Sequence, residues 1–180
     1  MGTLIRLTPL LFAAAVVCQT PPSPEPYTVP EAYEVYSALL PQDWMITAAH
    51  ADPLVFQAET KPYKICLEPE ASSKELVGPA IADYVKVNQK QWLLRGQFHI
   101  QPLFQIVPAE QLSNVLKIYH SVGWVELSAV GFNAEKTVAV VYIGHHCGGL
   151  CGGGGFHVLE KKDGKWQPLK WRGSSCFWAS

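Results

Sequence analysis

Apolar residues early in the chain recur every three to four positions, as they do along one face of a helix. Thr28-Val-Pro-Glu31 has the form of a capping box with proline in the first turn, and the apolar positions that follow are Ala32, Val35, Tyr36, Leu39 and Leu40. This pattern predicts a first helix over residues 29–40, which ends at Pro41.

Two further helices are expected before the last third of the chain. Ile81, Tyr84 and Val85 share one helical face and predict a helix within residues 74–94, where Gly78-Pro79 either starts or kinks it. Residues 108–119 begin with proline and carry apolar residues at helical spacing, so they predict a short helix.

Runs rich in β-branched and aromatic residues predict strands over residues 53–60, 63–67 and 103–107. The last third contains four more strand-like segments with short connections, which indicate antiparallel pairing. We expect the second and third of these to pair directly, with His146 and His157 facing across, or near, a glycine-rich loop. The four segments are 124–133, 137–146, 156–162 and 165–171.

This order of elements predicts an α+β fold, with helices in the N-terminal part and a C-terminal antiparallel β-meander that carries a Gly/Cys-rich hairpin loop. A hydrophobic content of 48% and a charged content of 16% are typical of a folded chain. We expect one domain over residues 28–180, because about 150 residues are enough to bury a core.

Residues 1–17 have the proportions of a signal peptide, because Arg6 precedes an apolar run that is too short to span a bilayer. Residues 13–15 are alanines that suit a signal peptidase, whereas Cys18 lies where a bacterial lipoprotein carries its lipidated cysteine. Residues 18–27 contain four prolines and predict an extended tether. We expect an exported protein that is periplasmic, secreted or lipid-anchored at the cell envelope through Cys18.

The charge pattern gives no reason to expect a nucleic-acid partner. The formal net charge is −1, and the clustered bases near the C-terminus are interrupted by Glu160 and Asp163, as on a solvated strand face. No motif for a bound cofactor is present, so we expect none. The ligand or protein partner is left open.

The cysteines suggest disulfide bonds. The chain has five, and if Cys18 is removed with the leader or lipidated, an even set of four remains: Cys66, Cys147, Cys151 and Cys176. In an oxidising compartment such a set favours two disulfides, whose pairing has three alternatives.

The segment 144–157 packs two cysteines, three histidines and seven glycines into fourteen residues. Our leading interpretation is structural: a bond between Cys147 and Cys151 closes the long hairpin connection 147–155, or one of them pairs with Cys176.

Two chemical alternatives use the same segment. In one, His145 or His146 joins Cys147, Cys151 and His157 as ligands of zinc or copper, although paired zinc cysteines usually have two residues between them. In the other, Cys147 or Cys151 is a nucleophile and His146 or His157 its base, in a hydrolase or acyl transferase.

Four short blocks resemble a group of bacterial exported proteins and lipoproteins of unknown activity. They are Ser128-Ala-Val-Gly-Phe-Asn133, Val140-Val-Tyr-Ile-Gly144, Cys147-Gly-Gly-Leu-Cys151-Gly and Gly164-Lys-Trp166. The resemblance covers residues 120–180 and implies bacterial export and a shared sheet. It implies no catalytic residue.

Together these patterns predict an exported bacterial domain that acts as a binding or structural module, with a disulfide-stiffened glycine-rich loop. The alternative is an enzyme or a zinc or copper protein that uses the same loop. Whether it is an enzyme is left open.

Overall fold

A computed structural model describes residues 23–42, 53–100, 103–119, 123–147 and 151–180. The expected signal peptide, Cys18 and the first part of the proline-rich tether lie outside these residues. Strand β1 (Glu25–Pro26) and the buried Tyr27 show that the folded part already includes the end of the expected tether. Within the described ranges, no helix is both long enough and apolar enough to cross a membrane.

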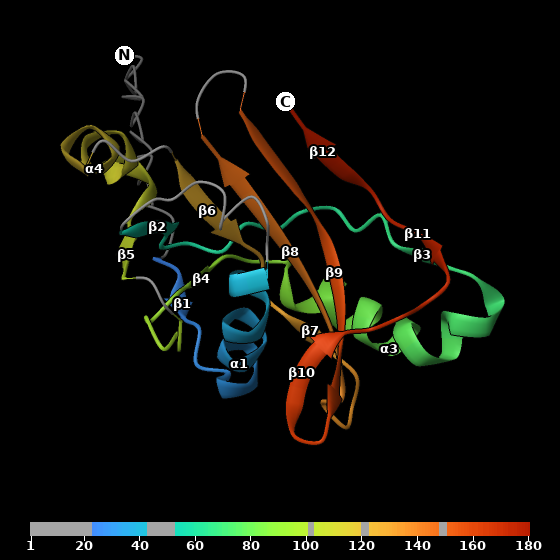
Figure 1. Cartoon of the computed structure of the whole chain (residues 1–180). Helices are drawn as coiled ribbons and strands as arrows, with labels where there is room; N and C mark the ends of the chain where they lie inside the picture. The colour runs from blue at the N-terminus through green and yellow to red at the C-terminus, as the bar shows by residue number, and fades with distance from the viewer. Residues whose placement is uncertain (1–22, 43–52, 101–102, 120–122, 148–150) are drawn as a thin grey trace, which may run out of the picture.

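One sheet of eight strands organises the molecule (Figure 1). Six strands lie in the spatial order β10-β9-β8-β6-β2-β5, while β12 pairs with β9 and β7 pairs with β8. Neighbours from β10 to β6 are antiparallel, whereas β2 is parallel to both β6 and β5. The bounds are β2 Leu54–Gln57, β5 Phe104–Val107, β6 Trp124–Leu127, β7 Gly131–Phe132, β8 Val138–His146, β9 Gly152–Lys162, β10 Lys165–Pro168 and β12 Phe177–Ala179.

Helices and two small strand pairs surround this sheet. Strand β1 pairs with β4 in parallel, and β3 pairs with β11 antiparallel. The bounds are α1 Pro30–Leu39, η1 Leu40–Gln42, α3 Ala71–Val87, η2 Ala109–Gln111, α4 Leu112–Tyr119, β3 Glu68–Pro69, β4 Trp92–Leu93 and β11 Gly173–Ser174.

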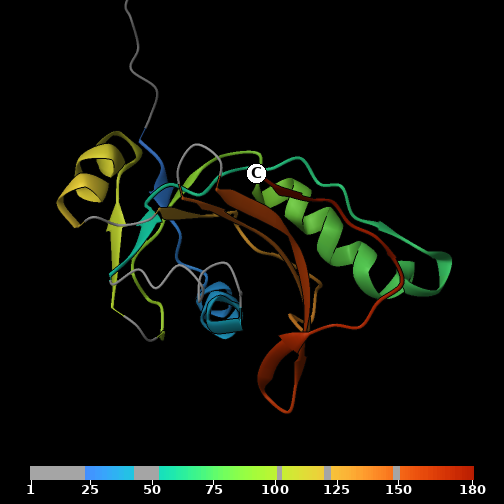
Figure 2. The same ribbon diagram turned by 45° about the horizontal axis from the view of Figure 1, so that its top comes forward.

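Helices α1 and α3 cover opposite faces of the sheet (Figure 2). Alternate residues of β8 divide between two cores, because side chains on a strand point to alternate faces. Ala139, Val141 and Ile143 pack in the core that contains α1, whereas Val138 and Val140 pack with residues of α3. We call these the α1 face and the α3 face of the sheet.

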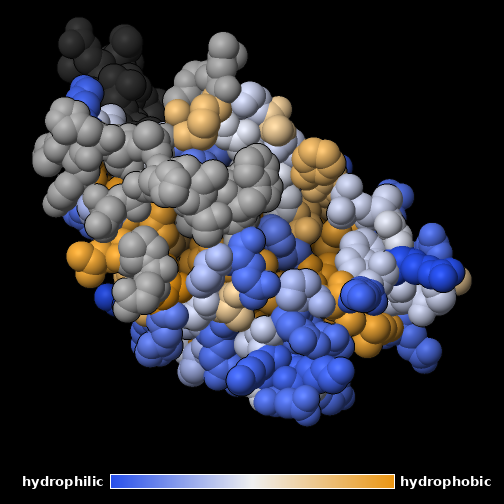
Figure 3. Space-filling view, in the orientation of Figure 1, coloured by the Kyte–Doolittle hydropathy of each residue, from blue (hydrophilic) through white to orange (hydrophobic). Residues whose placement is uncertain are grey.

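The hydrophilic end of the molecule coincides with the turn between β9 and β10. Hydrophilic residues gather at this lower end in Figure 3, where Lys161, Lys162 and Lys165 lie on the two strands around Asp163-Gly164. Lys161 also forms an ion pair with Glu34 of α1, at 2.7 Å. Lys161 therefore links β9 to α1, whereas the turn itself is solvated.

The expected mixture of helices and strands in an α+β fold is confirmed. The first two predicted helices correspond to α1 and α3, and the third corresponds to η2 followed by α4. Pro79 lies inside α3. Strands β2 and β5 come from the earlier part of the chain and join the same sheet as the C-terminal strands. The prediction of a strand over residues 63–67 is wrong, because that segment pairs with no strand among the described residues.

The segment Ser128–Asn133 holds the sheet and α3 together. The Ser128 hydroxyl accepts a hydrogen bond from the Tyr142 amide at 2.8 Å. The hydroxyl thus takes the place of the backbone carbonyl that would accept this bond in a regular sheet. Asn88 at the end of α3 bonds both the amide and the carbonyl of Ala129. A Cβ on Gly131 would lie 2.3 Å from the backbone nitrogen of Tyr84, so only glycine allows this close approach of α3.

We therefore expect Gly131→Ala to lower the free energy of unfolding by about 1–3 kcal/mol, the usual cost of overpacking against a backbone that must move. The matched control is Gly78→Ala, which also replaces a glycine but meets nothing within 4 Å on α3. That variant should keep or gain stability, because alanine is the better helix former. Thermal melting of both variants measures the contrast, and equal melting temperatures would contradict it.

Candidate functional site at the end of the β8–β9 hairpin

The Cys147–Cys151 disulfide closes the end of the β8–β9 hairpin. Pairing of the two strands runs up to His146 opposite Gly152, and the Cys147 amide donates to the Cys151 carbonyl at 3.0 Å. The two Cα atoms are 5.0 Å apart. The connection is therefore shorter than the expected 147–155, because Gly152–Gly155 already belong to β9.

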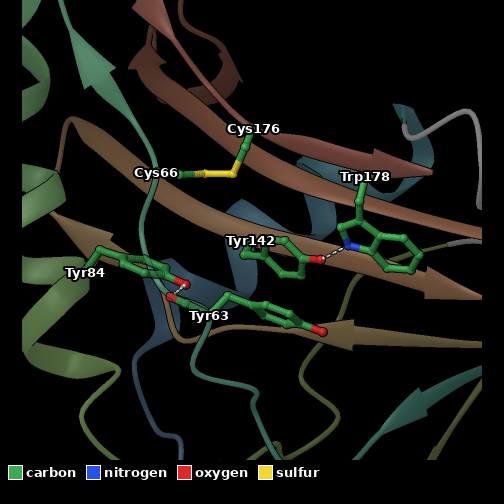
Figure 4. Close-up of a disulfide and its surroundings, with 6 residues drawn as sticks. All are labelled: Tyr63, Cys66, Tyr84, Tyr142, Cys176 and Trp178. Carbon is green, nitrogen blue, oxygen red and sulfur yellow. Dashed lines mark hydrogen bonds between the residues drawn. A yellow bond between two sulfur atoms is a disulfide. The ribbon is translucent and has the colours of Figure 1, made fainter. Parts of the chain in front are cut away.

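A second disulfide joins Cys66 to Cys176, with 5.9 Å between the Cα atoms (Figure 4). It ties the extended segment 61–67 to the residues that lead into β12. In the same view the Tyr63 ring lies against the Tyr142 ring of β8, with centroids 3.7 Å apart. Segment 61–67 thus covers part of the α3 face through side chains.

A buried carboxylate lies on this face, close to the first disulfide. Along β6, Val125 and Leu127 pack in the α1 core, so Trp124 and Glu126 point to the α3 face. The Glu126 side chain is only 3% exposed. A charge this deeply buried requires several partners to offset its lost hydration.

Glu126 has four partners drawn from three parts of the chain. Tyr63 donates a hydrogen bond to Oε2 at 2.5 Å, and the Lys61 ammonium lies 3.1 Å from Oε1. Nε2 of His146 on β8 is 3.0 Å from Oε2, and the Trp124 indole donates to Oε1 at 3.4 Å. The contact with His146 is an ion-pair distance without the alignment of a hydrogen bond.

These partners keep Glu126 ionised. Burial alone would raise the pKa of Glu126, but the contacts with His146, Tyr63 and Lys61 outweigh it and lower the pKa to about 2. Burial and the neighbouring carboxylate both raise the pKa of Tyr63, so its phenol remains a hydrogen-bond donor.

Aromatic rings enclose His146. Trp124 stacks on its imidazole at 4.8 Å between centroids, and Trp178 of β12 lies at 5.4 Å. The Trp178 indole also donates to the Tyr142 hydroxyl at 2.5 Å, as Figure 4 shows. A Cβ on Gly154 would come within 2.3 Å of that hydroxyl, so the glycine of β9 makes room for this contact.

The other predicted site histidines lie elsewhere. His145 is 5% exposed and alternates with His146, which places it on the α1 face. His157 lies opposite Val141, whereas His146 lies opposite Gly152. The two strands pair directly, as predicted, but His146 and His157 do not face each other across the loop, because β9 begins four residues earlier than predicted.

The structure brings only part of the predicted site together. Of the candidates, Cys147, Cys151 and His146 meet at the hairpin end, and both sulfurs are held in a disulfide rather than as thiolates. No group of three or more His, Cys, Asp or Glu side chains within the described residues is arranged to hold a metal ion.

Glu126, Tyr63, Lys61 and the tryptophans were missed by sequence reasoning. A signal was present in residues 124–127, where a single glutamate alternates with apolar residues in a strand. The ionised carboxylate accepts a hydrogen bond from Tyr63, pairs with Lys61 and lies beside the His146 imidazole. The partners from segment 61–67 had no signal, since their contact depends on the tertiary fold.

Comparisons with protein-family models, curated proteins and solved structures found no match for this chain.

We expect the ionised Glu126 to make the fold sensitive to acid. Its lowered pKa stabilises the protein above the unfolded-state value of 4.5, and this contribution disappears as the pH falls through about 2. The shift corresponds to about 3 kcal/mol. Glu126→Gln should thus melt well below the wild type at neutral pH, and the two curves should converge near pH 2.

The matched control is Glu75→Gln, which removes an exposed carboxylate from α3. Its melting temperature should follow that of the wild type across the same pH range. A constant difference between Glu126→Gln and wild type from pH 7 to pH 2 would argue against an ionised Glu126.

Proposed function

We propose that this protein is an exported bacterial binding or structural module that displays a disulfide-stiffened glycine-rich loop. The observation that carries this proposal is the Cys147–Cys151 bond at the hairpin end, directly after the Glu126–His146 contact. In this proposal the C-terminal antiparallel strands are the unit that presents the loop, and the N-terminal helices are its support.

Two disulfides support an extracytoplasmic location, since such bonds persist mainly in oxidising compartments. The apolar leader and the resemblance to bacterial exported proteins point the same way. We include in the proposal a signal peptide over residues 1–17, with Cys18 as a candidate for lipid attachment and for a membrane tether.

The surroundings of the loop suit recognition. The His146 side chain is 28% exposed and that of Lys61 is 42% exposed, so both reach solvent beside partly buried tryptophans. Their ordered contacts with Glu126 limit the side-chain entropy lost when a ligand binds. A hairpin end closed by a disulfide next to fixed polar and aromatic groups is an arrangement that favours binding.

The second candidate is an enzyme that uses the same residues. The Glu126–His146 contact favours it, because a carboxylate next to an imidazole is a recurrent part of acid–base catalysis. A cysteine nucleophile or a zinc or copper site would require Cys147 or Cys151 as a thiolate, and hence reduction of the disulfide.

Counting thiols in the unreduced mature protein, with and without a chelator, separates these functions. We expect no free thiol among Cys66, Cys147, Cys151 and Cys176 under either condition. Thiols released only by the chelator would establish a metal site, and one rapidly alkylated thiol would establish a nucleophile.

Mass spectrometry of the N-terminus tests export, and an intact leader on a cytoplasmic product would contradict it.

The two disulfides should differ in their effect on stability. By loop entropy, the short Cys147–Cys151 ring contributes about 2 kcal/mol and the long Cys66–Cys176 loop about 5 kcal/mol. We therefore expect Cys147→Ser/Cys151→Ser to melt slightly below the wild type and Cys66→Ser/Cys176→Ser far below it. Denaturant unfolding of both double variants checks the order, and the reverse order would contradict it.

A further inference from the structure

Within the part of the chain that the structure describes, strand β12 has one unpaired edge. It pairs with β9 on one side, and on its other side no strand lies among the described residues. The Ser180 amide donates to the Gly152 carbonyl at 3.1 Å, and antiparallel partners alternate between bonded and non-bonded pairs. Trp178 is therefore bonded to Gly154, whereas the amides and carbonyls of Phe177 and Ala179 point away from β9.

This edge lacks the features that usually protect exposed strands. Residues 173–180 contain no charged side chain and no proline, two common barriers to pairing with another chain. Phe177 is 80% exposed. Beside it, a pocket of about 410 Å³ has Ala179, His157, Pro168 and Leu39 in its wall and no Asp, Glu, Lys or Arg. An apolar, uncharged occupant suits it.

We propose that β12 pairs with β12 of a second copy of this chain. The two strands run antiparallel and are related by a twofold axis that passes between their Trp178 residues. In this register Phe177 of each copy lies opposite Ala179 of the other. Their outward amides and carbonyls meet as bonded pairs, which gives four hydrogen bonds across the axis. Only the register centred on Trp178 pairs both sets of free backbone groups with each other.

The side chains fit the same symmetry. Phe177 and Ala179 lie on one face of β12, and the twofold axis brings each large ring over the small alanine of the other copy. Ala179 lines the apolar pocket, so the partner ring gains an apolar wall there. Such self-complementarity is the requirement for a closed symmetric dimer, and it favours a second copy over an unrelated peptide.

Three residues form a short ladder, which buries less area than a standard stable interface. The dimer should therefore depend on protein concentration and on the two phenylalanine rings. This inference does not depend on the proposed binding role, since it rests on the edge of β12 and not on the hairpin loop.

Sedimentation equilibrium of the oxidised protein tests the dimer. The wild type should show a monomer–dimer equilibrium. Phe177→Ser should raise the dissociation constant at least about tenfold, since two rings per dimer lose their burial. Ala179→Pro should weaken the dimer similarly, because it removes an outward amide without touching the bonds to β9. The matched control is Val85→Ser, which removes a 48% exposed side chain from α3 and should leave the constant unchanged.

Circular dichroism confirms that each variant is folded, and Phe177→Ser alone decides the result if Ala179→Pro is not. A wild type that remains monomeric at its highest soluble concentration overturns the proposal and leaves this edge to a different partner. Dimerisation that Phe177→Ser does not weaken, or that Val85→Ser weakens equally, overturns it as well.

Discussion

Burial of β8 on both faces determines the position of most other elements. Eight of its nine residues are buried, with α1 packed on one face, α3 on the other, and β6 and β9 on its two sides. Such a strand must be apolar at successive positions, and residues 138–143 contain valine, alanine, isoleucine and one tyrosine. Gly131 lets α3 approach the sheet closely, and the hydroxyl of Ser128 accepts a hydrogen bond from the Tyr142 amide of β8.

The polar residue at the end of β8 lies where the helices no longer cover this strand. His146 lies on the α3 face beyond the Val138 and Val140 region that α3 covers, and there segment 61–67 and the Trp178 side chain of β12 lie over the sheet instead. Those coverings supply the tyrosine, lysine and tryptophan that surround Glu126 and His146. The Cys66–Cys176 bond joins the two coverings to each other. The buried carboxylate and this disulfide are therefore parts of one tertiary arrangement.

Local signals in the sequence predicted the helices, because helical spacing acts within one segment. The capping box expected at Thr28 does not form, since the N-cap of α1 is Val29 and no side chain caps that end of the helix. The parallel pairing of β2 with β5 and β6 had no such signal, since it joins segments far apart in the chain. Residues 63–67 have the composition of a strand, but the segment contacts the sheet through the Tyr63 ring and not through strand pairing. The start of β9 was predicted four residues too late, because Gly152–Gly155 are poor strand formers. In the structure His157 therefore lies farther along β9 from His146 than predicted.

The unequal spans of the two disulfides also bear on the order in which the chain folds. Cys147 and Cys151 are separated by four positions and belong to one hairpin, so this bond can close as soon as that hairpin exists. Cys66 must wait for a partner 110 residues later, and the ends of that loop meet only when almost all of the described chain is in place. Until then segment 61–67 has no covalent hold on the sheet. The short separation thus favours early oxidation of Cys147, and the long separation favours oxidation of Cys66 late in folding.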